Sequence, residues 1–286
     1  MSFVGGVDVG STATKLVLMD GDRVVAGKAA PAGVNYRQTA SRLLADALEE
    51  ARREPGEIEY MVATGYGRRM VDFADELVSE ITANAAGARW LTRGRAAAVR
   101  TVVDVGGQDS KAISLDEAGS VVNFAMNDRC AAGTGRFLEM MGRVLEVEIE
   151  RFGELALQAT EPVRISSLCA VFAESEVISI LSQGGRIPDI IAALHESIAK
   201  RVGAMVKRIG VEEAVLFDGG PARNGGLAGA LERELGVELI VPPEPQLSTA
   251  IGAAAIADKL RRERGRGQGG RGRDSRKGEP GDHRIY

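Results

Sequence analysis

The sequence is short of the residues on which several common classes of protein depend. Aromatic residues make up only 4% of its 286 positions, and it contains two cysteines and two histidines. Two cysteines in so long a chain argue against a disulfide framework. No apolar run approaches the ~20 residues that a membrane-spanning helix needs, and no charged-then-apolar signal segment opens the chain. We therefore expect a cytoplasmic protein with no membrane partner.

Two motifs of nucleotide-binding enzymes are also missing. There is no G-x-x-x-x-G-K-[ST] element, which argues against a P-loop enzyme. No G-x-G-x-x-G follows a strand and opens a helix with an acidic residue ~20 positions later, which argues against a Rossmann dehydrogenase. The net charge of −4 argues against binding of nucleic acid by the body of the protein.

Small residues are what the sequence has in abundance. It contains 36 glycines, and hydrophobic residues reach 44%, which fits a loop-punctuated α/β architecture. Residues 261–286 differ from the rest, with nine Lys or Arg, four Asp or Glu and seven Gly. Such a composition buries too little apolar surface to fold, so we predict a disordered basic tail. A solvated appendage is favoured there over an RNA- or partner-binding segment.

A short strand that closes on an acid and a glycine occurs twice. Val7-Asp8-Val9-Gly10 and Val103-Asp104-Val105-Gly106 lie 96 residues apart, and each is followed by a Ser, a Lys and a returning strand. Each copy reads as a β-hairpin, not as a strand followed by a helix. We predict a structural duplication, with a first lobe at 1–100, a second lobe at 101–260 and the tail at 261–286.

Apolar spacing places the other elements. A strand is predicted over residues 59–64 and another just before Asp218. Helical periodicity is found over residues 37–53, 137–147, 171–183 and 187–209.

The two hairpins have the chemistry of a phosphate site. A phosphate chain needs backbone N–H donors brought close by glycine, and a carboxylate to hold Mg²⁺ or its waters. Facing hairpins could enclose the β- and γ-phosphates with Mg²⁺ between Asp8 and Asp104. A single D-x-G turn is common turn chemistry, whereas two copies and a third turn, Phe217-Asp218-Gly219-Gly220, are more specific. The expected nucleotide contacts are Gly10, Ser11, Thr12, Lys15, Gly106 and Gly107. Gly133 and Thr134 are further candidates, although they could simply begin a helix.

Each cysteine stands just ahead of a predicted helix. The positive end of a helix dipole lowers the pKa of a thiol and stabilises anionic clusters, and Arg129 adds a positive charge beside Cys130. Core packing of Cys130 and Cys169, or a disulfide between them, are the alternatives. Two thiolates are too few for the four-cysteine ligation of a cubane cluster, but a twofold dimer would supply four.

The hairpins and the third turn resemble those of the acetate and sugar kinase, heat-shock chaperone and actin superfamily. The resemblance covers residues 3–260 and includes the segment Pro243–Ala254, which is similar to the last nucleotide segment of that group. It implies a duplicated α/β ATPase fold, with two lobes around a nucleotide cleft. It also implies that Gly219, Gly220 and Gln246 lie near the adenosine.

Three segments carry a more specific resemblance. Residues 104–111, 127–137 and 169–177 are similar to the activators of 2-hydroxyacyl-CoA dehydratases, a family shared with the ATPase subunits of benzoyl-CoA reductase. The resemblance implies a homodimer in which Cys130 and Cys169 of both copies bind one bridging 4Fe–4S cluster.

The same resemblance implies the activity. ATP hydrolysis to ADP would drive single electrons to a partner acyl-CoA dehydratase or reductase, after reduction by a donor such as ferredoxin or flavodoxin. Asp8, Asp104 and Gln108 become the candidates for holding Mg²⁺ and the attacking water. The sequence departs from the family at Asn84, where histidine is frequent.

Two other functions remain open at this point. A small-molecule kinase of the same fold, acting on a sugar or an acyl group, would need a carboxylate base facing a substrate hydroxyl and no paired cysteines. A regulatory nucleotide sensor would bind ATP tightly with negligible turnover.

Overall fold

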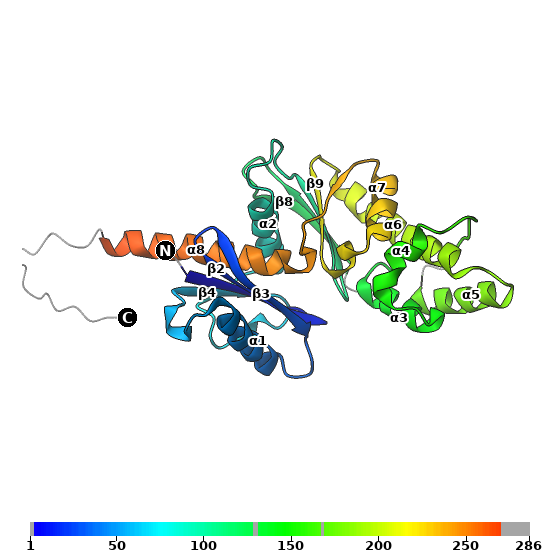
Figure 1. Ribbon diagram of the computed structural model, residues 1–286. Helices are drawn as coiled ribbons and strands as arrows, with labels where there is room; N and C mark the ends of the chain where they lie inside the picture. The colour runs from blue at the N-terminus through cyan, green and yellow to red at the C-terminus, as the bar shows by residue number, and fades with distance from the viewer. Residues whose placement is uncertain (1–2, 128–130, 167–168, 270–286) are drawn as a thin grey trace, which may run out of the picture.

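The structure is a computed structural model that describes residues 3–127, 131–166 and 169–269. Its strands form two five-stranded sheets with the orders β3-β2-β1-β4-β5 and β10-β9-β6-β7-β8. Figure 1 shows one sheet in each lobe, with a group of helices at the far end of the second lobe. This arrangement confirms the predicted α/β fold. Among the described helices, none combines the length and the apolar content that crossing a membrane requires.

The first lobe is built on a meander of three antiparallel strands. β1 pairs with β2, and β2 with β3, while β4 and β5 add to the other side of β1 in parallel. α1 covers one face of this sheet and shares a core with it. The elements are β1 (Phe3–Val9), β2 (Ala13–Asp20), β3 (Arg23–Pro31), α1 (Tyr36–Ala51), β4 (Tyr60–Thr64) and β5 (Glu76–Leu77), with short 3₁₀ turns at Pro55–Glu57 and Arg68–Met70.

The second lobe repeats this plan. β6 pairs antiparallel with β7 and parallel with β9, as β1 does with β2 and β4. Its strands are β6 (Thr101–Val105), β7 (Ser110–Leu115), β8 (Val121–Asn127), β9 (Val215–Asp218) and β10 (Leu239–Ile240). The repeat explains the duplicated motif in the sequence, because each copy ends the central strand of a sheet.

Five helices and three 3₁₀ turns complete the second lobe. α6 begins at a proline in its first turn, where the missing N–H is tolerated, and buries one side against the sheet. The helices are α3 (Gly135–Leu145), α4 (Phe152–Ala156), α5 (Ala170–Ser182), α6 (Ile187–Ile209) and α7 (Gly225–Leu235). The 3₁₀ turns are Ile149–Arg151, Gly220–Arg223 and Pro245–Leu247.

Two helices cross between the lobes. α2 (Glu80–Leu91) follows the first sheet in sequence but packs Ala85 and Ala88 against the second. α8 (Ser248–Gly269) follows the second sheet but packs on the first, where Ala250 and Ala254 join its core. The division of the chain at residue 100 is therefore wrong for these helices, because each one covers the sheet of the other lobe.

The crossing of α2 and α8 is very close. A side chain on Gly87 would collide with the carbonyl of Ser248, and one on Gly252 would collide with the carbonyl of Ala83. Glycine at both positions lets the two backbones touch.

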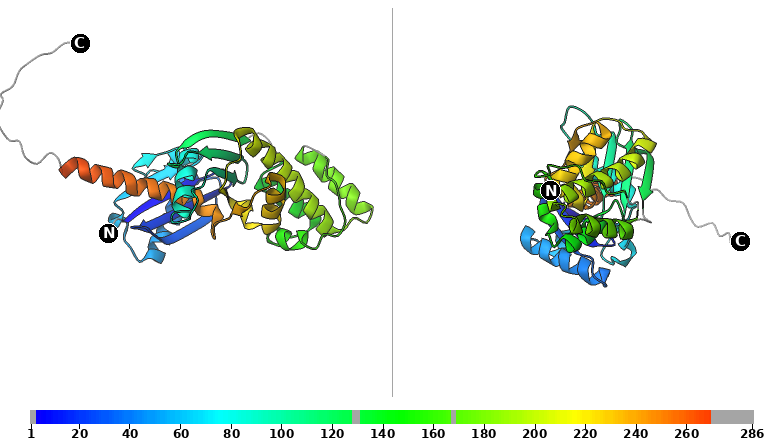
Figure 2. Two further views of the ribbon diagram at one scale, coloured as in Figure 1. Left: turned by 90° about the horizontal axis from the view of Figure 1, so that it is seen from above. Right: turned by 90° about the vertical axis from the view of Figure 1, so that its right-hand side faces the viewer.

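α8 also corrects the predicted start of the tail. Seen from above, the helix runs along the first lobe and projects beyond it (Figure 2). It continues to Gly269, nine residues into the segment predicted as disordered. Arg261 forms an ion pair with Glu59 of the first lobe and another with Asp258 one turn earlier in the helix. Residues 270–286 of the predicted tail lie outside the described residues.

Candidate functional site

Each lobe presents an aspartate paired with a lysine across its first hairpin. Asp8 on β1 lies opposite Lys15 on β2, and Asp104 on β6 lies opposite Lys111 on β7, in the same antiparallel register. The Nζ–Oδ2 distances are 3.0 Å and 3.1 Å. Both aspartates are largely buried, with 6% and 8% of their surface exposed. The duplication therefore places two equivalent ion pairs at the ends of the two central strands.

The two hairpins touch each other. A side chain on Gly107 would collide with that of Thr12, so the turn of one lobe lies directly against the turn of the other. The remaining predicted phosphate contacts of the hairpins, Gly10, Ser11 and Gly106, lie in these two turns. The structure thus brings together the nucleotide candidates of both lobes.

The start of α3 is fastened to the second hairpin. The N–H groups of Gly135 and Arg136 donate to the carbonyls of Gly106 and Gly107, at 2.9 Å and 2.8 Å. The Ser110 hydroxyl donates to the carbonyl of Gly133. Gly133 and Thr134 therefore lie beside the second hairpin.

The third acid-glycine turn lies at the same edge of the second sheet. Asp218 ends β9 directly beside Asp104, in parallel register. Gly219 follows with φ +88°, where a side chain would collide with the carbonyl of Val105. Its N–H donates to the carbonyl of Pro245 at 3.1 Å, which holds the turn that contains Gln246 against it. Gly219, Gly220 and Gln246 are thus brought together next to the second hairpin, on which Gln108 is exposed.

Lys111 is the centre of an ion network that its sequence context did not reveal. Its side chain is 4% exposed, and its ammonium lies 3.1 Å, 2.9 Å and 3.8 Å from the carboxylates of Asp104, Asp109 and Glu80. Burial disfavours the charge, but these carboxylates outweigh it, so the pKa of Lys111 is raised. The lysine stays charged while buried, and it neutralises a cluster of acids beside the phosphate hairpins.

Glu80 is a second residue that sequence reasoning missed. It begins α2, and burial raises the pKa of its carboxyl, opposed by Lys111 and reinforced by Asp109 and Asp104. Its side chain is 31% exposed. A partly exposed carboxyl with a raised pKa has the properties of a general base. The segment around Glu80 stood out in the sequence, but nothing there placed it next to the hairpins.

Asp218 and Asn84 form a hydrogen-bonded pair beside Asp104. Asp218 is fully buried, and burial together with the neighbouring Asp104 raises the pKa of its carboxyl well above the ordinary value. The Asn84 amide donates to its two carboxyl oxygens at 3.3 Å and 3.5 Å, and lies 3.2 Å from the Thr249 hydroxyl. Asn84 on α2 thus links the third turn to α8, at the crossing between the lobes.

Cys169 is exposed and immediately precedes α5. This position is inconsistent with core packing of Cys169, one of the alternatives that the sequence left open. Val171, Phe172 and Ile178 on the same helix are 64%, 68% and 52% exposed. Cys130 lies outside the described residues. Within the described part of the chain, no three His, Cys, Asp or Glu side chains gather into a metal site.

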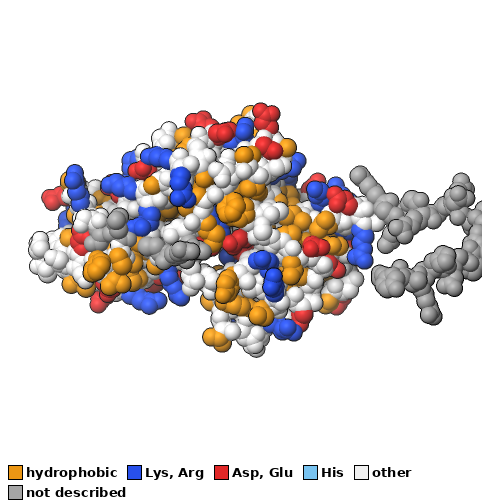
Figure 3. Space-filling view, turned by 180° about the vertical axis from the view of Figure 1, so that it is seen from behind, with side chains coloured by type: hydrophobic (Ala, Val, Ile, Leu, Met, Phe, Trp, Pro, Cys, Tyr) orange, Lys and Arg blue, Asp and Glu red, His pale blue; other side chains and the backbone are white. Residues whose placement is uncertain are grey.

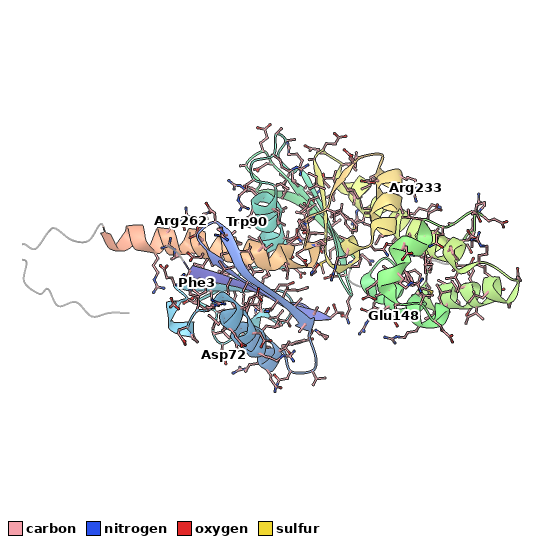
Figure 4. The ribbon with its side chains drawn as sticks, in the orientation of Figure 1. Phe3, Asp72, Trp90, Glu148, Arg233 and Arg262 are labelled. Atoms are coloured by element: carbon pink, nitrogen blue, oxygen red, sulfur yellow. The ribbon has the colours of Figure 1, made fainter. Side chains whose placement is uncertain are left out.

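His195 contacts the segment that follows the third turn. It is 1% exposed on α6, and its Nε2 lies 3.0 Å from the amide nitrogen of Asn224, the residue that caps α7 after that turn. Burial, with a smaller effect of Arg233, lowers the pKa of His195 to about 4. Arg233 is labelled on α7 in Figure 4. His195 is therefore a neutral structural residue.

Comparison with known proteins gives the family. Residues 6–257 match the BadF/BadG/BcrA/BcrD ATPase family. The chain belongs to this family. The resemblance found in the sequence motifs is thereby confirmed, and membership of an ATPase family supports binding of ATP and ADP.

Characterised relatives are close. The chain is 44% identical over 253 residues to the 2-hydroxyisocaproyl-CoA dehydratase activator of Clostridioides difficile, which covers 88% of this chain and 93% of the relative. It is 45% identical over 256 residues to the (R)-2-hydroxyglutaryl-CoA dehydratase activating ATPase of Acidaminococcus fermentans, with 89% and 96% covered.

Solved structures agree with both the family and the fold. The activator of the 2-hydroxyisocaproyl-CoA dehydratase from Clostridium difficile, solved with bound ADPNP, superposes with a TM-score of 0.87 at 42% identity over 93% of this chain and 97% of that one. A ROK family glucokinase from Streptomyces griseus matches with a TM-score of 0.56 at 12% identity, over 90% of this chain and all of the other. The second similarity concerns the fold alone, which is shared with actin-like ATPases.

Proposed function

We propose that this protein hydrolyses ATP between its two hairpins and uses the cycle to pass single electrons at low potential to a partner acyl-CoA dehydratase or reductase. The electrons would leave a 4Fe–4S cluster shared by two copies of the chain and reduced by a ferredoxin or flavodoxin. The observation that carries the proposal is the pair of facing Asp–Lys hairpins in a member of an ATPase family whose close relatives are dehydratase activators.

The residues of the cleft divide the work of hydrolysis. Asp8 and Asp104 supply oxygen ligands from opposite sides of the cleft, the kind of donor that Mg²⁺ prefers, and the ion when bound would neutralise the β- and γ-phosphates. The glycine turns leave room for the phosphates to approach the backbone. Glu80 accepts the proton of the attacking water, and Gln108 orients that water from the exposed hairpin. Gly219, Gly220 and Gln246 lie at the edge where the adenosine binds.

The cysteines have the surroundings that a shared cluster needs. Cys169 is exposed at the N-terminus of a 13-residue helix, whose dipole favours the thiolate. The exposed side chains of Val171, Phe172 and Ile178 give the same helix an apolar surface that a second copy would cover. Cys130 and Cys169 provide two thiolates per chain, so a twofold pair provides the four that a cubane takes. When bound, the cluster supplies a one-electron redox couple.

A short path connects the nucleotide to one of these cysteines. Gly106 and Gly107 of the phosphate hairpin accept hydrogen bonds from Gly135 and Arg136. Gly135 lies five residues after Cys130 in the sequence. Closure of the two lobes on ATP would move the hairpin together with this segment. Binding of the nucleotide would therefore shift the position of the cysteine.

The iron content of the protein tests the cluster. Protein purified without oxygen should be brown and hold about four iron atoms per dimer, and Cys130→Ala or Cys169→Ala should remove most of the iron. Ser182→Ala, at the other end of α5, is the matched control and should keep it. A double cysteine variant with full iron content contradicts the proposal.

The coupling is tested by electrochemistry on the same protein. Titration of the cluster with ATP, with ADP and without nucleotide should give different reduction potentials, because linkage makes the effect of the two sites reciprocal. A shift of about 59 mV in a one-electron couple corresponds to about 1.4 kcal/mol, which is within ordinary allosteric coupling. Identical potentials in all three states would remove the coupled mechanism.

A further inference from the structure

β8 is an edge strand without the usual protection. It pairs with β7 on one side and is the last strand of its sheet. Its sequence, VVNFAMN, contains no charged residue and no proline over seven positions. Alternate residues Val122, Phe124 and Met126 are 67%, 52% and 36% exposed, so one face of the strand is a row of apolar side chains. Natural proteins rarely leave such an edge open, because it is a template for pairing with another chain.

The equivalent edge of the first lobe is protected. β3 occupies the same place in the repeat, but it carries Arg23, Lys28 and Pro31, and Lys28 forms an ion pair with Glu50. The two other edges, β5 and β10, are only two residues long. Among the sheets of the described residues, β8 is thus the one long edge that is both apolar and uncharged.

The position of β8 links it to the proposed site. Met126 lies opposite Lys111 in the antiparallel register, and Asn127 lies opposite Ser110. Lys111 binds Asp104 in the phosphate hairpin, and Cys130 follows Asn127 by three residues. The strand therefore runs from the apolar row past the nucleotide site to a proposed cluster ligand. Figure 3 shows hydrophobic side chains gathered near the middle of the rear face, where the lobes meet.

We infer that β8 is the docking edge for an extended, apolar segment of the electron-accepting protein, which adds to the second sheet as a sixth strand. The inference rests on the proposed function, because it takes the acceptor of the electrons as the partner. Backbone N–H and C=O groups of β8 would pair with the added segment, while Val122, Phe124 and Met126 would receive its alternate side chains.

A second copy of this chain fits the edge less well. Two β8 edges related by a twofold axis pair antiparallel, and a pairing centred on Phe124 would set the two Asn127 residues about 20 Å apart, at ~3.3 Å per residue. The two chains leave such a pair at opposite ends, which does not favour a cysteine site shared at the axis. An acceptor protein meets no such conflict, and at β8 it would contact the strand that adjoins both the nucleotide hairpin and Cys130.

Binding to three purified dehydratases tests the inference. The probes are the 2-hydroxyisocaproyl-CoA, (R)-2-hydroxyglutaryl-CoA and lactoyl-CoA dehydratases, whose activators are the relatives of this chain. At least one should bind the cluster-loaded protein with ATP. Phe124→Lys and Val122→Lys should weaken that binding about tenfold or more, because an edge lysine blocks strand addition and an apolar anchor is lost. Val24→Lys, on the protected edge β3, is the matched control and should bind like the wild type.

Amide hydrogen exchange distinguishes strand addition from simple contact. The amides of β8 should become protected in the complex, while those of β3 should not change. ATPase rate, iron content and melting temperature of the Phe124→Lys protein should equal those of the wild type, which separates docking from folding.

Each contrary result has a definite reading. Equal binding by Phe124→Lys and wild type, or β8 amides that stay unprotected in the complex, overturns the docking edge and leaves the proposed function standing. Failure of the wild type to bind any of the three dehydratases overturns the acceptor as occupant. A wild-type protein that holds no iron, or that does not hydrolyse ATP, contradicts the proposed function instead.

Discussion

In the first lobe the ammonium of Lys15 pairs with one carboxylate, that of Asp8, whereas the equivalent ammonium of Lys111 in the second lobe lies among three. Both lysines stand seven residues after their aspartate and opposite it in the same register. Burial opposes the charge of Lys15 too, and Asp8 raises its pKa. The hairpin is thus the same in both lobes, while the number of carboxylates around its lysine differs.

The parallel neighbour of the central strand also differs between the two lobes. β4 and β9 both run parallel to the central strand, and each is followed by a glycine with φ +88°. The residue before that glycine is Thr64 in the first lobe, where its hydroxyl donates to the carbonyl of Val78, and the buried Asp218 in the second. The comparison teaches that duplication supplied two equivalent turns, and that buried acidic groups are concentrated around the turn of the second lobe.

The largest effect should come from the paired aspartates. Asp8→Ala and Asp104→Ala should each lower Mg²⁺-dependent ATP hydrolysis by about a hundredfold or more, because each removes a ligand of the metal–phosphate group. The visible spectrum of the cluster should change little in either variant. Unchanged turnover in both would mean that the phosphate site lies elsewhere, and a loss in Asp104→Ala alone would confine the metal to the second lobe.

Substitution of Glu80 should change the rate of ATP hydrolysis but not the binding of ATP. Glu80→Gln should lower kcat for ATP by about 10²-fold with little change in KM, because the amide cannot accept a proton. The pKa of Glu80 is raised by burial, so the wild-type rate should fall as pH falls through that raised pKa, when the carboxyl becomes protonated.

The pH profile of kcat is the deciding measurement for this role. The acidic limb should be lost in Glu80→Gln, while Glu76→Gln, on the exposed strand β5, should keep it. An acidic limb that persists unchanged in Glu80→Gln would assign the proton to another group.

The two lysines should differ in their contribution to stability. Lys111→Met should lower the free energy of unfolding by about 3 kcal/mol, because it leaves several nearby carboxylates without a counter-charge in a largely buried site. Lys15→Met should cost less, about 1–2 kcal/mol, since its side chain is 20% exposed and forms an ion pair with Asp8 alone. Urea unfolding of both variants measures the difference. Equal losses would show that the extra acids around Lys111 are already neutral.

His195 should give the second lobe a pH dependence that the first lacks. The pKa of His195 is about 4 in the folded protein, against about 6.5 for a free imidazole, so the unfolded state binds the extra proton. Its stabilising contribution is complete above pH 6.5 and is lost as pH falls toward 4, by about 2–3 kcal/mol in total. His195→Gln should flatten this dependence.

Hydrogen exchange can assign the loss to a lobe. Residues 1–100 contain no histidine. Between pH 6.5 and 4, amides of α6 and α7 should therefore lose protection before those of α1. Loss in both lobes at the same pH would attribute the effect to the carboxylates.

What the sequence could predict follows from how local each signal is. The hairpins were predictable because Asp-x-Gly followed by a returning strand is a contiguous pattern, and the long helices α1 and α6 repeat their apolar residues at helical spacing. The network of Lys111 was not, because Glu80 comes from a different element and reaches it only through the crossing of α2. The exposure of Cys169 was also hidden, since the residues around it are apolar and read as core.

β8 is an element that was not predicted from the sequence. Large apolar residues alternate with small or polar ones from Val122 to Asn127, but the large ones face outward, and the edge position of the strand depends on the order of the sheet. The exchange of α2 and α8 between lobes has a similar cause. A boundary drawn along the chain cannot represent helices that pack on the sheet of the other half.

The glycine contact between α2 and α8 has a geometric consequence for signalling. Gly252 is the fifth residue of a helix that ends at Gly269, so 17 residues, or about 25 Å, extend beyond the contact at 1.5 Å per residue. Because Ala254 and Arg261 hold α8 on the first lobe, a rotation between the lobes would turn the helix and that lobe together about this contact. A tilt of about 5° at this contact sweeps the far end of α8 through about 2 Å. A probe fixed to the projecting end of α8 would therefore magnify an angular change that is almost invisible at the phosphates.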